Sequence, residues 1–182
     1  MNRRFSKDQL TDIKDRGIFF DANILIYLFW PTGAQECVKT YSSLYNSLLK
    51  LNTTCYVDFI IVSEFVNRTI KLEYNNYLWR TNREFADYPY KKYRDSQDGK
   101  DMLADIYQII ESSILGNFQV IGKGFNEKEI RESLQVDCLD FSDKAIEMIC
   151  KENDYVLLTT DSDFRFSDID ILSLRDRILQ VK

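Results

Sequence analysis

A short apolar run that stops at an acidic residue is the feature that most constrains how this chain can fold. Residues 17–27 read Gly-Ile-Phe-Phe-Asp-Ala-Asn-Ile-Leu-Ile-Tyr, which predicts a buried strand followed directly by a helix. Asp21 then stands at the carboxyl end of the strand, where open α/β sheets bind their ligands. An aspartate between two apolar segments is costly to bury unless a cation or a hydrogen-bond donor meets it. The rest of the sequence therefore has to supply a hydrogen-bond donor for Asp21 or further ligands for a cation beside it.

The chain contains no histidine. This excludes Ser-His and Cys-His nucleophile pairs, the H-E-x-x-H zinc site and histidine as a general base. Hydrolytic chemistry would have to rest on carboxylates, oxygen-liganded metals or lysine. The formal net charge of −5 argues against the passive coating of nucleic acid by basic proteins. It does not exclude an enzyme that acts on nucleic acid, because an acidic metal site is itself part of that charge.

Length and composition predict one domain over residues 1–182, since 182 residues with 45% hydrophobic side chains can form a sizeable core. No apolar run approaches the roughly 20 residues that span a bilayer, and the N-terminus lacks an apolar signal-peptide segment. We therefore expect a cytoplasmic protein without a membrane partner. The four cysteines are scattered without a C-x-x-C pair, which favours reduced thiols over disulfides or a zinc site; they are Cys37, Cys55, Cys138 and Cys150.

The first half of the chain has the β-α-β order of a parallel sheet. Residues 1–16 predict a short helix or a loose lead-in, and Pro31-Thr32-Gly33 predicts a turn. A helix is expected over residues 35–51, a second strand over residues 55–60 and a further helix from about residue 61. In that helix Glu64 borders an apolar stripe in the first turns. Its alternative role is an acid that the helix dipole favours near an N-terminus.

Residues 75–100 interleave basic and aromatic side chains and predict an excursion from the core. This combination suits stacking on bases and pairing with phosphates. The alternative is an amphipathic helical arm that packs its aromatic side chains on the body or on a second subunit. Basic side chains on a surface are also commonly just solvated. The candidate RNA contacts are Arg68, Lys71, Arg80, Arg83, Lys91, Lys92 and Arg94.

The second half of the chain alternates helices and strands in the same way. Helices are predicted over residues 101–115 and 127–134, with a short strand at 118–121 between them. The next helix carries two acids at its start. Asp140 suits an N-cap, with metal contact as a second role, and Asp143 lies on the face of the helix that carries the apolar residues.

A second apolar strand that stops at an acid follows at residues 155–164, which read Tyr-Val-Leu-Leu-Thr-Thr-Asp-Ser-Asp-Phe. Asp161 and Asp163 are again delivered to the carboxyl edge of the sheet. Residues 170–174 predict a final edge strand.

Acids from four separate segments are thus expected to converge: Asp21, Glu64, Asp143 and Asp161, with Asp163 and Asp140 near. Two unit charges about 4 Å apart repel by roughly 4 kcal/mol at an effective dielectric constant near 20, so a bare cluster would oppose folding or force protonation. A divalent cation removes that repulsion. Because the available ligands are oxygen atoms, Mg²⁺ or Mn²⁺ fits better than zinc.

These residues resemble the four ordered motifs of PIN-domain nucleases. The matching segments are residues 20–26 (Phe-Asp-Ala-Asn-Ile-Leu-Ile), 63–65 (Ser-Glu-Phe), 143–146 (Asp-Lys-Ala-Ile) and 158–164 (Leu-Thr-Thr-Asp-Ser-Asp-Phe). The resemblance implies an α/β fold of three α/β/α layers around a central parallel sheet, with a core of about residues 17–174. Residues 77–100 and 123–137 are longer than in a minimal toxin of this type.

The resemblance also implies a function. PIN domains cleave RNA phosphodiester bonds with Mg²⁺ or Mn²⁺, often as the toxin of a VapC-type toxin-antitoxin pair, which makes RNA, an antitoxin protein and a second copy of the chain the expected partners. The family's acidic positions correspond to Asp21, Glu64, Asp143 and Asp161, and its supporting polar positions to Asn23, Thr160 and Asp163.

Two other functions remain open from the sequence. A PIN-like fold could serve as a non-catalytic RNA-binding or scaffold module. An aspartate-based phosphotransferase also places an acid after a strand, with Asp21 as the nucleophile.

Overall fold

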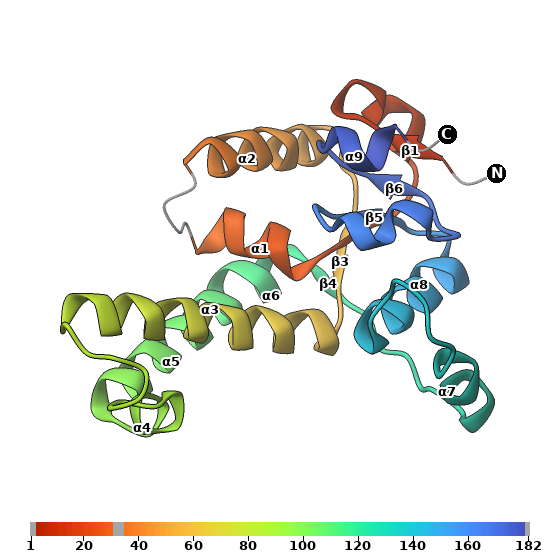
Figure 1. Cartoon of the computed structure of the whole chain (residues 1–182). Coiled ribbons are helices and arrows are strands. Elements are labelled where there is room, and N and C mark those ends of the chain that lie inside the picture. The colour runs from red at the N-terminus through yellow and green to blue at the C-terminus, as the bar shows by residue number, and fades with distance from the viewer. Residues whose placement is uncertain (1–2, 31–34, 181–182) are drawn as a thin grey trace.

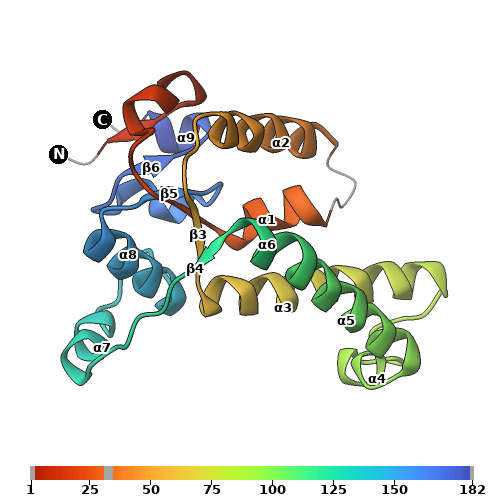
Figure 2. The ribbon, with the colours of Figure 1, turned by 180° about the vertical axis from the view of Figure 1, so that it is seen from behind.

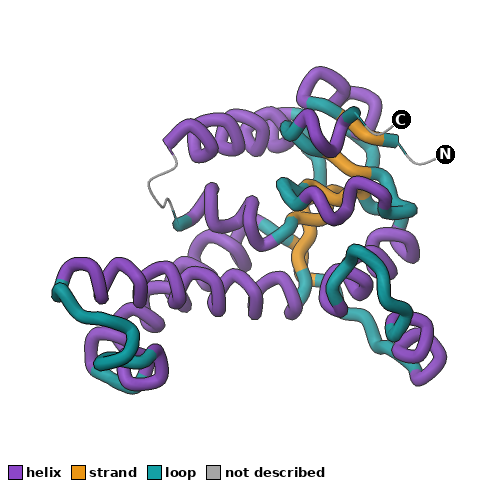
Figure 3. Tube along the Cα trace, in the orientation of Figure 1, coloured by secondary structure: helices purple, strands orange, loops and turns teal. Residues whose placement is uncertain are grey.

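The computed structural model describes residues 3–30 and 35–180; the predicted turn at Pro31-Thr32-Gly33 lies outside them. Its helices surround a short-stranded sheet at the centre (Figures 1 and 3). The strands are β1 (Arg4–Phe5), β2 (Ile18–Phe20), β3 (Cys55–Val57), β4 (Gln119–Val120), β5 (Val156–Leu158) and β6 (Ile171–Leu172). The α-helices are α1 (Ala22–Phe29), α2 (Gln35–Lys50), α3 (Phe59–Arg80), α4 (Tyr90–Arg94), α5 (Gln97–Ile109), α6 (Leu115–Asn117), α7 (Glu127–Ser133), α8 (Phe141–Asn153) and α9 (Asp176–Leu179). The 3-10 helices are η1 (Lys7–Ile13) and η3 (Ser162–Phe166), and the π-helical turn is η2 (Ile110–Ile114).

The sheet is parallel throughout, in the order β1-β6-β5-β2-β3-β4. The predicted central parallel sheet is therefore confirmed. From β2 the chain moves outward to β3 and β4, whereas β5 and β6 lie on the other side of β2. The strand order thus reverses between β2 and β5, and such a switch point opens a crevice at the carboxyl ends of the strands.

The final strand predicted at residues 170–174 is confirmed as β6, but its predicted place at the edge of the sheet is wrong, because β1 pairs with its outer side. Arg4 pairs with Ile171 and Phe5 with Leu172, and the Arg3 N–H donates to Asp170 Oδ1 over 2.6 Å. The N-terminal segment, which was expected to be a short helix or a loose lead-in, supplies this edge strand before η1 begins. A two-residue strand carries too little alternation to be recognised in sequence.

The second predicted strand is shorter than expected, and the helix after it starts earlier. β3 ends at Val57, and Asp58 caps α3 by accepting a hydrogen bond from the Ile61 N–H over 2.8 Å. Phe59 and Ile60, which were expected to be extended, are therefore helical. An aspartate N-cap satisfies one of the free N–H groups of the first turn, and this outweighs the β-propensity of the two following residues.

Most other predicted elements are confirmed with small boundary shifts. The helices predicted at residues 35–51 and 127–134 are α2 and α7, and the strand predicted at 118–121 is β4. Helix α5 starts at Gln97, before the predicted residue 101, because Ser96 caps it by accepting from the Gly99 N–H over 3.2 Å.

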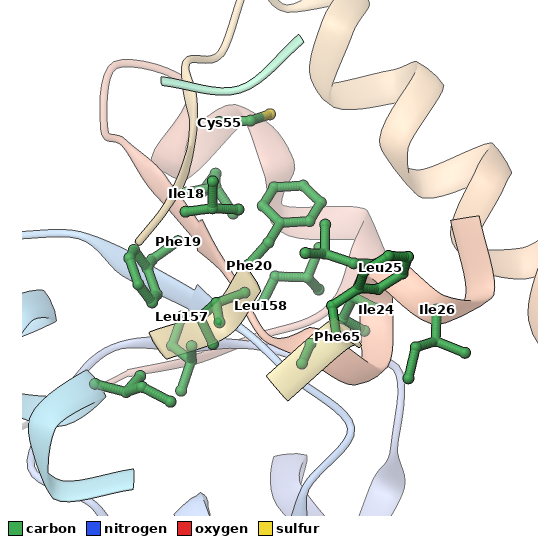
Figure 4. Packing of buried hydrophobic residues seen from close by; sticks show 14 of the residues in the cluster. Ile18, Phe19, Phe20, Ile24, Leu25, Ile26, Cys55, Phe65, Leu157 and Leu158 are labelled. Carbon is green, nitrogen blue, oxygen red and sulfur yellow. The ribbon is translucent and has the colours of Figure 1, made fainter. Parts of the chain in front are cut away.

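The core centres on β2, whose three residues are fully buried. Phe19 and Phe20 lie beside Leu157 and Leu158 of β5 and near Phe65 of α3 (Figure 4). The Phe20 ring meets the Phe118 ring edge-on, with 4.9 Å between the centroids. Helix α1 continues the apolar run and lies between α2 and α3 in both views (Figures 1 and 2). This packing fixes the end of β2, and with it the position of Asp21.

The region of residues 75–100 is an arm built from the end of α3, α4 and the start of α5, which reaches away from the sheet (Figure 1). Several of its aromatic side chains pack on one another: the centre of the Tyr77 ring lies 5.5 Å from that of Tyr88 and 4.9 Å from that of Tyr93, which is buried. Trp79 and Phe85 remain exposed. Among the residues that the structure describes, no helix is long and apolar enough to cross a membrane.

Gly17 offers a test of the packing at the start of β2. A Cβ atom at this position would lie 2.5 Å from Tyr155 Cδ1 and 2.6 Å from Tyr56 Cε2, whose rings stack with centroids 4.3 Å apart. We expect Gly17→Ala to lower the free energy of unfolding by about 1–3 kcal/mol, because overpacking forces the rings apart. Urea unfolding measures this. Gly124→Ala is the matched control, since nothing lies within 4 Å of its added Cβ; an equal effect of the two variants would contradict the packing argument.

Candidate active site

Asp21 sits at the switch point, where it follows β2 and caps α1. It is 5% exposed. Its Oδ1 accepts a hydrogen bond from the Asn23 N–H over 3.2 Å, and its Oδ2 accepts one from the Thr159 hydroxyl over 2.5 Å. Burial raises the pKa of Asp21, the two hydrogen bonds and the charge of Arg68 oppose that rise, and Asp161 adds to it. The predicted need for a partner is met in part by donors from the chain itself.

Thr159 links the two acidic strand ends and was not singled out from the sequence. Its hydroxyl donates to Asp21 and accepts from the Asp161 N–H over 2.9 Å. Because Phe20 and Leu158 are paired in register, the residues that follow them must meet. The resemblance pointed instead to Thr160, which is also buried. The register of two acid-terminated strands was the signal that could have identified Thr159.

Asp161 is half-buried at the end of β5 and caps η3, where its Oδ1 accepts from the Asp163 N–H over 3.0 Å. The side chain of Asp163 is exposed. Asp163 is thus tied to the site through its backbone.

Glu64 reaches the site from the second turn of α3. Burial raises its pKa, Arg68 lowers it, and the negative charges of Asp21, Asp140 and Asp161 raise it further. The carboxylate of Glu64 pairs with the Arg68 guanidinium, with 2.5 Å between Oε1 and Nη2. The Nη1 atom of the same guanidinium donates to Asn23 Oδ1, also over 2.5 Å. Asn23, predicted to be a supporting residue, therefore contacts the site through its side chain and its N–H.

Asp140 and Asp143 form the predicted capping box at the start of α8. The Asp143 N–H donates to Asp140 Oδ1 over 2.9 Å, and the Asp140 N–H donates to Asp143 Oδ2 over 3.3 Å. Burial would raise the pKa of Asp140, but hydrogen bonds from Asp143 and Ser142 outweigh it and the pKa is lowered. Asp143 behaves in the opposite way. Burial, followed by the charges of Asp140, Asp161 and Asp21, raises its pKa to about 7.

The structure thus brings Asp21, Glu64 and Asp143 within electrostatic reach of Asp161. The charge of Asp161 acts on three acids from separate elements, which are Asp21, Glu64 and Asp143. A hard divalent cation prefers oxygen ligands such as these carboxylates, and its charge would relieve the repulsion between them. Within residues 3–30 and 35–180, no group of three or more Asp, Glu or Cys side chains is arranged to hold a metal ion as the side chains stand. The Glu64 carboxylate is occupied by Arg68.

Two open grooves flank Arg68 beside these acids. One has a volume of about 410 Å³ and runs along α3 to the start of α8; its lining includes Phe59, Glu64 and Ser142. The other has a volume of about 330 Å³ and is lined in part by Asn23 and Tyr27 of α1. Arg68 and Lys71 line both grooves. These are the candidate RNA contacts that lie next to the acids.

The other candidate RNA contacts lie on the arm and are partly engaged there. The Arg83 guanidinium lies 4.4 Å from the centre of the Tyr88 ring, and Lys92 Nζ lies 4.9 Å from it. Arg94 pairs with Asp95 over 2.8 Å. Arg80 and Lys91 are exposed.

Comparison with known proteins identifies the fold. No protein-family model matches the sequence, and no curated protein matches it. The structure is similar to that of VapBC2 from Rickettsia felis bound to a DNA fragment from its promoter, with 16% identity over 86% of this chain and 98% of that chain and a TM-score of 0.50. FitAcB from Neisseria gonorrhoeae aligns with 17% identity over 85% of this chain and 96% of that chain, with a TM-score of 0.49. At this level of sequence identity, the structural likeness shows a shared fold alone. The predicted PIN-like α/β fold is confirmed.

Replacing Thr159 tests the link between the two strand ends. Thr159→Val keeps the shape but leaves Asp21 Oδ2 and the Asp161 N–H without their partner. We expect the free energy of unfolding to fall by about 2–3 kcal/mol, because the partners left behind are a buried carboxylate and an amide. Thr160→Val is the matched control, since no side-chain hydrogen bond of Thr160 is found in the described part of the chain. Urea unfolding of the two variants decides; a Thr159→Val protein within about 0.5 kcal/mol of wild type would argue against the link.

The raised pKa of Asp143 predicts how stability depends on pH without metal. Its ordinary value is 3.8 and its folded value is about 7, so the folded protein binds more protons between these two pH values. Stability contributed by Asp143 is therefore fully present below pH 3.8 and is lost as the pH rises through 7. With chelator at pH 8, Asp143→Asn should be more stable than wild type by about 1–2 kcal/mol, after allowance for solvent screening.

Urea unfolding of both proteins at pH 4, 6 and 8 measures this difference. Asp105→Asn is the control, because Asp105 is exposed on α5 and should change stability equally at each pH. A difference between Asp143→Asn and wild type that does not change with pH would contradict the prediction.

Proposed function

We propose that this protein is a metal-dependent ribonuclease that hydrolyses RNA phosphodiester bonds. The observation that supports it best is the convergence of Asp21 and Asp161 at the switch point, held by Thr159, with Glu64 and Asp143 within electrostatic reach. The fold that the chain shares with the VapBC2 structure is consistent with a nuclease of the PIN type.

The residues that would hold Mg²⁺ or Mn²⁺ are Asp21, Glu64, Asp143, Asp161 and Asp163. Such an ion supplies Lewis acidity, which ionises water near neutral pH and neutralises charge on phosphoryl oxygens. Asn23 and Thr159 restrict the Asp21 carboxylate, as partners of ligand side chains commonly do. Because the pKa of Asp143 is about 7, cation binding should displace a proton from it, and affinity should rise with pH.

RNA would lie along the grooves beside α3. Arg68 and Lys71 would contact its phosphates, and the exposed basic side chains of the arm would extend that contact. The exposed Phe59 ring, at the end of one groove, offers a stacking surface for a base.

VapBC2 from Rickettsia felis, whose fold this chain shares, is bound in its structure to a DNA fragment from its promoter. By analogy of fold we propose a toxin role for this chain, with an antitoxin protein as its partner, a homodimer as its assembly and the cytoplasm as its compartment. Growth arrest on expression that a neighbouring gene product relieves would support the toxin role. Harmless expression of an active nuclease would count against it.

Substitution of the two strand-end acids tests catalysis. We expect Asp21→Asn and Asp161→Asn each to lower the rate of RNA cleavage in Mg²⁺ or Mn²⁺ by at least about 100-fold, because each removes charge that holds the ion. Cleavage of labelled RNA measures this, with chelator as the metal-free control and Asp105→Asn as the matched variant. Equal cleavage rates for wild type, Asp21→Asn and Asp161→Asn would rule out catalysis at this site and favour a non-catalytic RNA-binding or scaffold module. A phosphorylated Asp21 would instead indicate a phosphotransferase, although both oxygens of this buried side chain already accept hydrogen bonds.

A further inference from the structure

Arg68 places a positive charge among the acids of the proposed site. It lies one helical turn after Glu64 on α3, so the two side chains share a face of the helix. Its charge opposes the rise in the pKa of Asp21 and of Glu64 and helps to lower the pKa of Asp140, and these three acids come from different elements. The guanidinium thus offsets part of the repulsion that a bound cation would offset.

The contacts of Arg68 occupy one proposed ligand of the ion and one residue that supports another ligand. Nη2 holds Glu64 Oε1, and Nη1 holds Asn23 Oδ1, each over 2.5 Å. Asn23 in turn donates its N–H to Asp21. The guanidinium therefore connects the α3 acid to the strand-end acid through Asn23, and a cation that binds Glu64 must compete with it.

The Glu64–Arg68 pair can be exchanged at low cost. The side chain of Arg68 is 43% exposed and that of Glu64 is 23% exposed. Ion pairs with this much solvent contact contribute only about 0–1 kcal/mol to stability. A divalent cation that meets several carboxylates at once gains more than this from the same charges.

A second ligand for Arg68 would lie in the grooves on either side of it. Both are lined by Arg68 and by Lys71, one helical turn further along α3. Two cations at this spacing on an exposed helix face suit consecutive phosphates of an extended strand, and a guanidinium binds phosphate oxygens with two parallel hydrogen bonds.

We propose that Arg68 is an exchangeable counter-ion of the active site: it neutralises Glu64 in the cation-free protein and moves to an RNA phosphate when a divalent cation takes Glu64. This inference rests on the proposed ribonuclease function. Cation and RNA then bind with positive coupling, because each removes the partner with which the other competes.

Mn²⁺ affinity in the absence of RNA tests the exchange. Isothermal titration should show that Arg68→Ala binds Mn²⁺ about 3- to 5-fold more tightly than wild type, since a pair worth up to about 1 kcal/mol no longer competes. Arg68→Lys keeps the charge and should stay near wild type. Lys71→Ala is the matched control, because Lys71 lines the same grooves but pairs with none of the acids in the described part of the chain; its Mn²⁺ affinity should be unchanged.

RNA affinity supplies the opposite readout. Binding of a fluorescent 2′-O-methyl RNA oligonucleotide, checked on a gel for integrity, should weaken at least about 5-fold in both Arg68→Ala and Lys71→Ala. In wild type, Mn²⁺ should strengthen RNA binding through its own contact with phosphate and through the release of Arg68, so this coupling should be smaller in Arg68→Ala and kept in Lys71→Ala. Circular dichroism checks that each variant is folded.

An Arg68→Ala protein that binds Mn²⁺ no more tightly than wild type would overturn the exchange, as would coupling that is as strong in this variant as in wild type. Failure of the proposed function has a different signature, which is wild-type protein that binds Mn²⁺ and RNA without cleaving RNA. Wild-type protein that binds no Mn²⁺ overturns both.

Discussion

The carboxylate of Asp21, buried between β2 and α1, is the group on which the rest of the site depends. Burial disfavours its charge, and hydrogen-bond donors and a positive charge beside it offset part of that cost. Thr159 and the Asn23 N–H are donors, Arg68 supplies a positive charge at short range, and Asp143 has a pKa of about 7. The apolar packing of β2 makes this burial unavoidable, because Phe19 and Phe20 fix the backbone directly before the acid. The same packing that stabilises the sheet therefore creates the demand for positive charge at its edge.

The sequence was sufficient to predict most of those parts of the fold that depend on local patterns. Acid-terminated apolar runs predicted β2 and β5, and the spacing of Asp140 and Asp143 predicted the capping box. Interactions between distant segments could not be predicted in this way. The pairing of β1 with β6, the contact of Thr159 with Asp21 and the bond between Arg68 and Asn23 each join residues at least 45 positions apart. The end of β3 was missed for a local reason, since Asp58 was read as part of a strand when it caps a helix.

Lys144 of α8 and Lys123, which precedes α7, are positive charges that several partners hold in one place. Lys144 is 8% exposed and donates to the carbonyls of Ser133 and Gln135 while it pairs with Asp137. Its partners include backbone groups, so it stabilises the chain path after α7. Lys123 similarly joins Glu129 and Glu152, each over 2.8 Å. Arg68 differs from both because it is more exposed and its two partners are side chains of the proposed site.

This contrast also bears on where a nucleic acid would be held. The arm carries many basic side chains, but Arg83 and Lys92 lie against the Tyr88 ring and Arg94 pairs with Asp95. Cation–π and surface ion pairs of this kind are weak, yet they occupy these side chains with partners on the arm itself. Arg68 and Lys71, by contrast, line grooves that contain Glu64 or Asn23. A phosphate that reached the acids would meet these two cations first, so in the proposed function the α3 face would govern access to the site and the arm would contact a strand that extends beyond it.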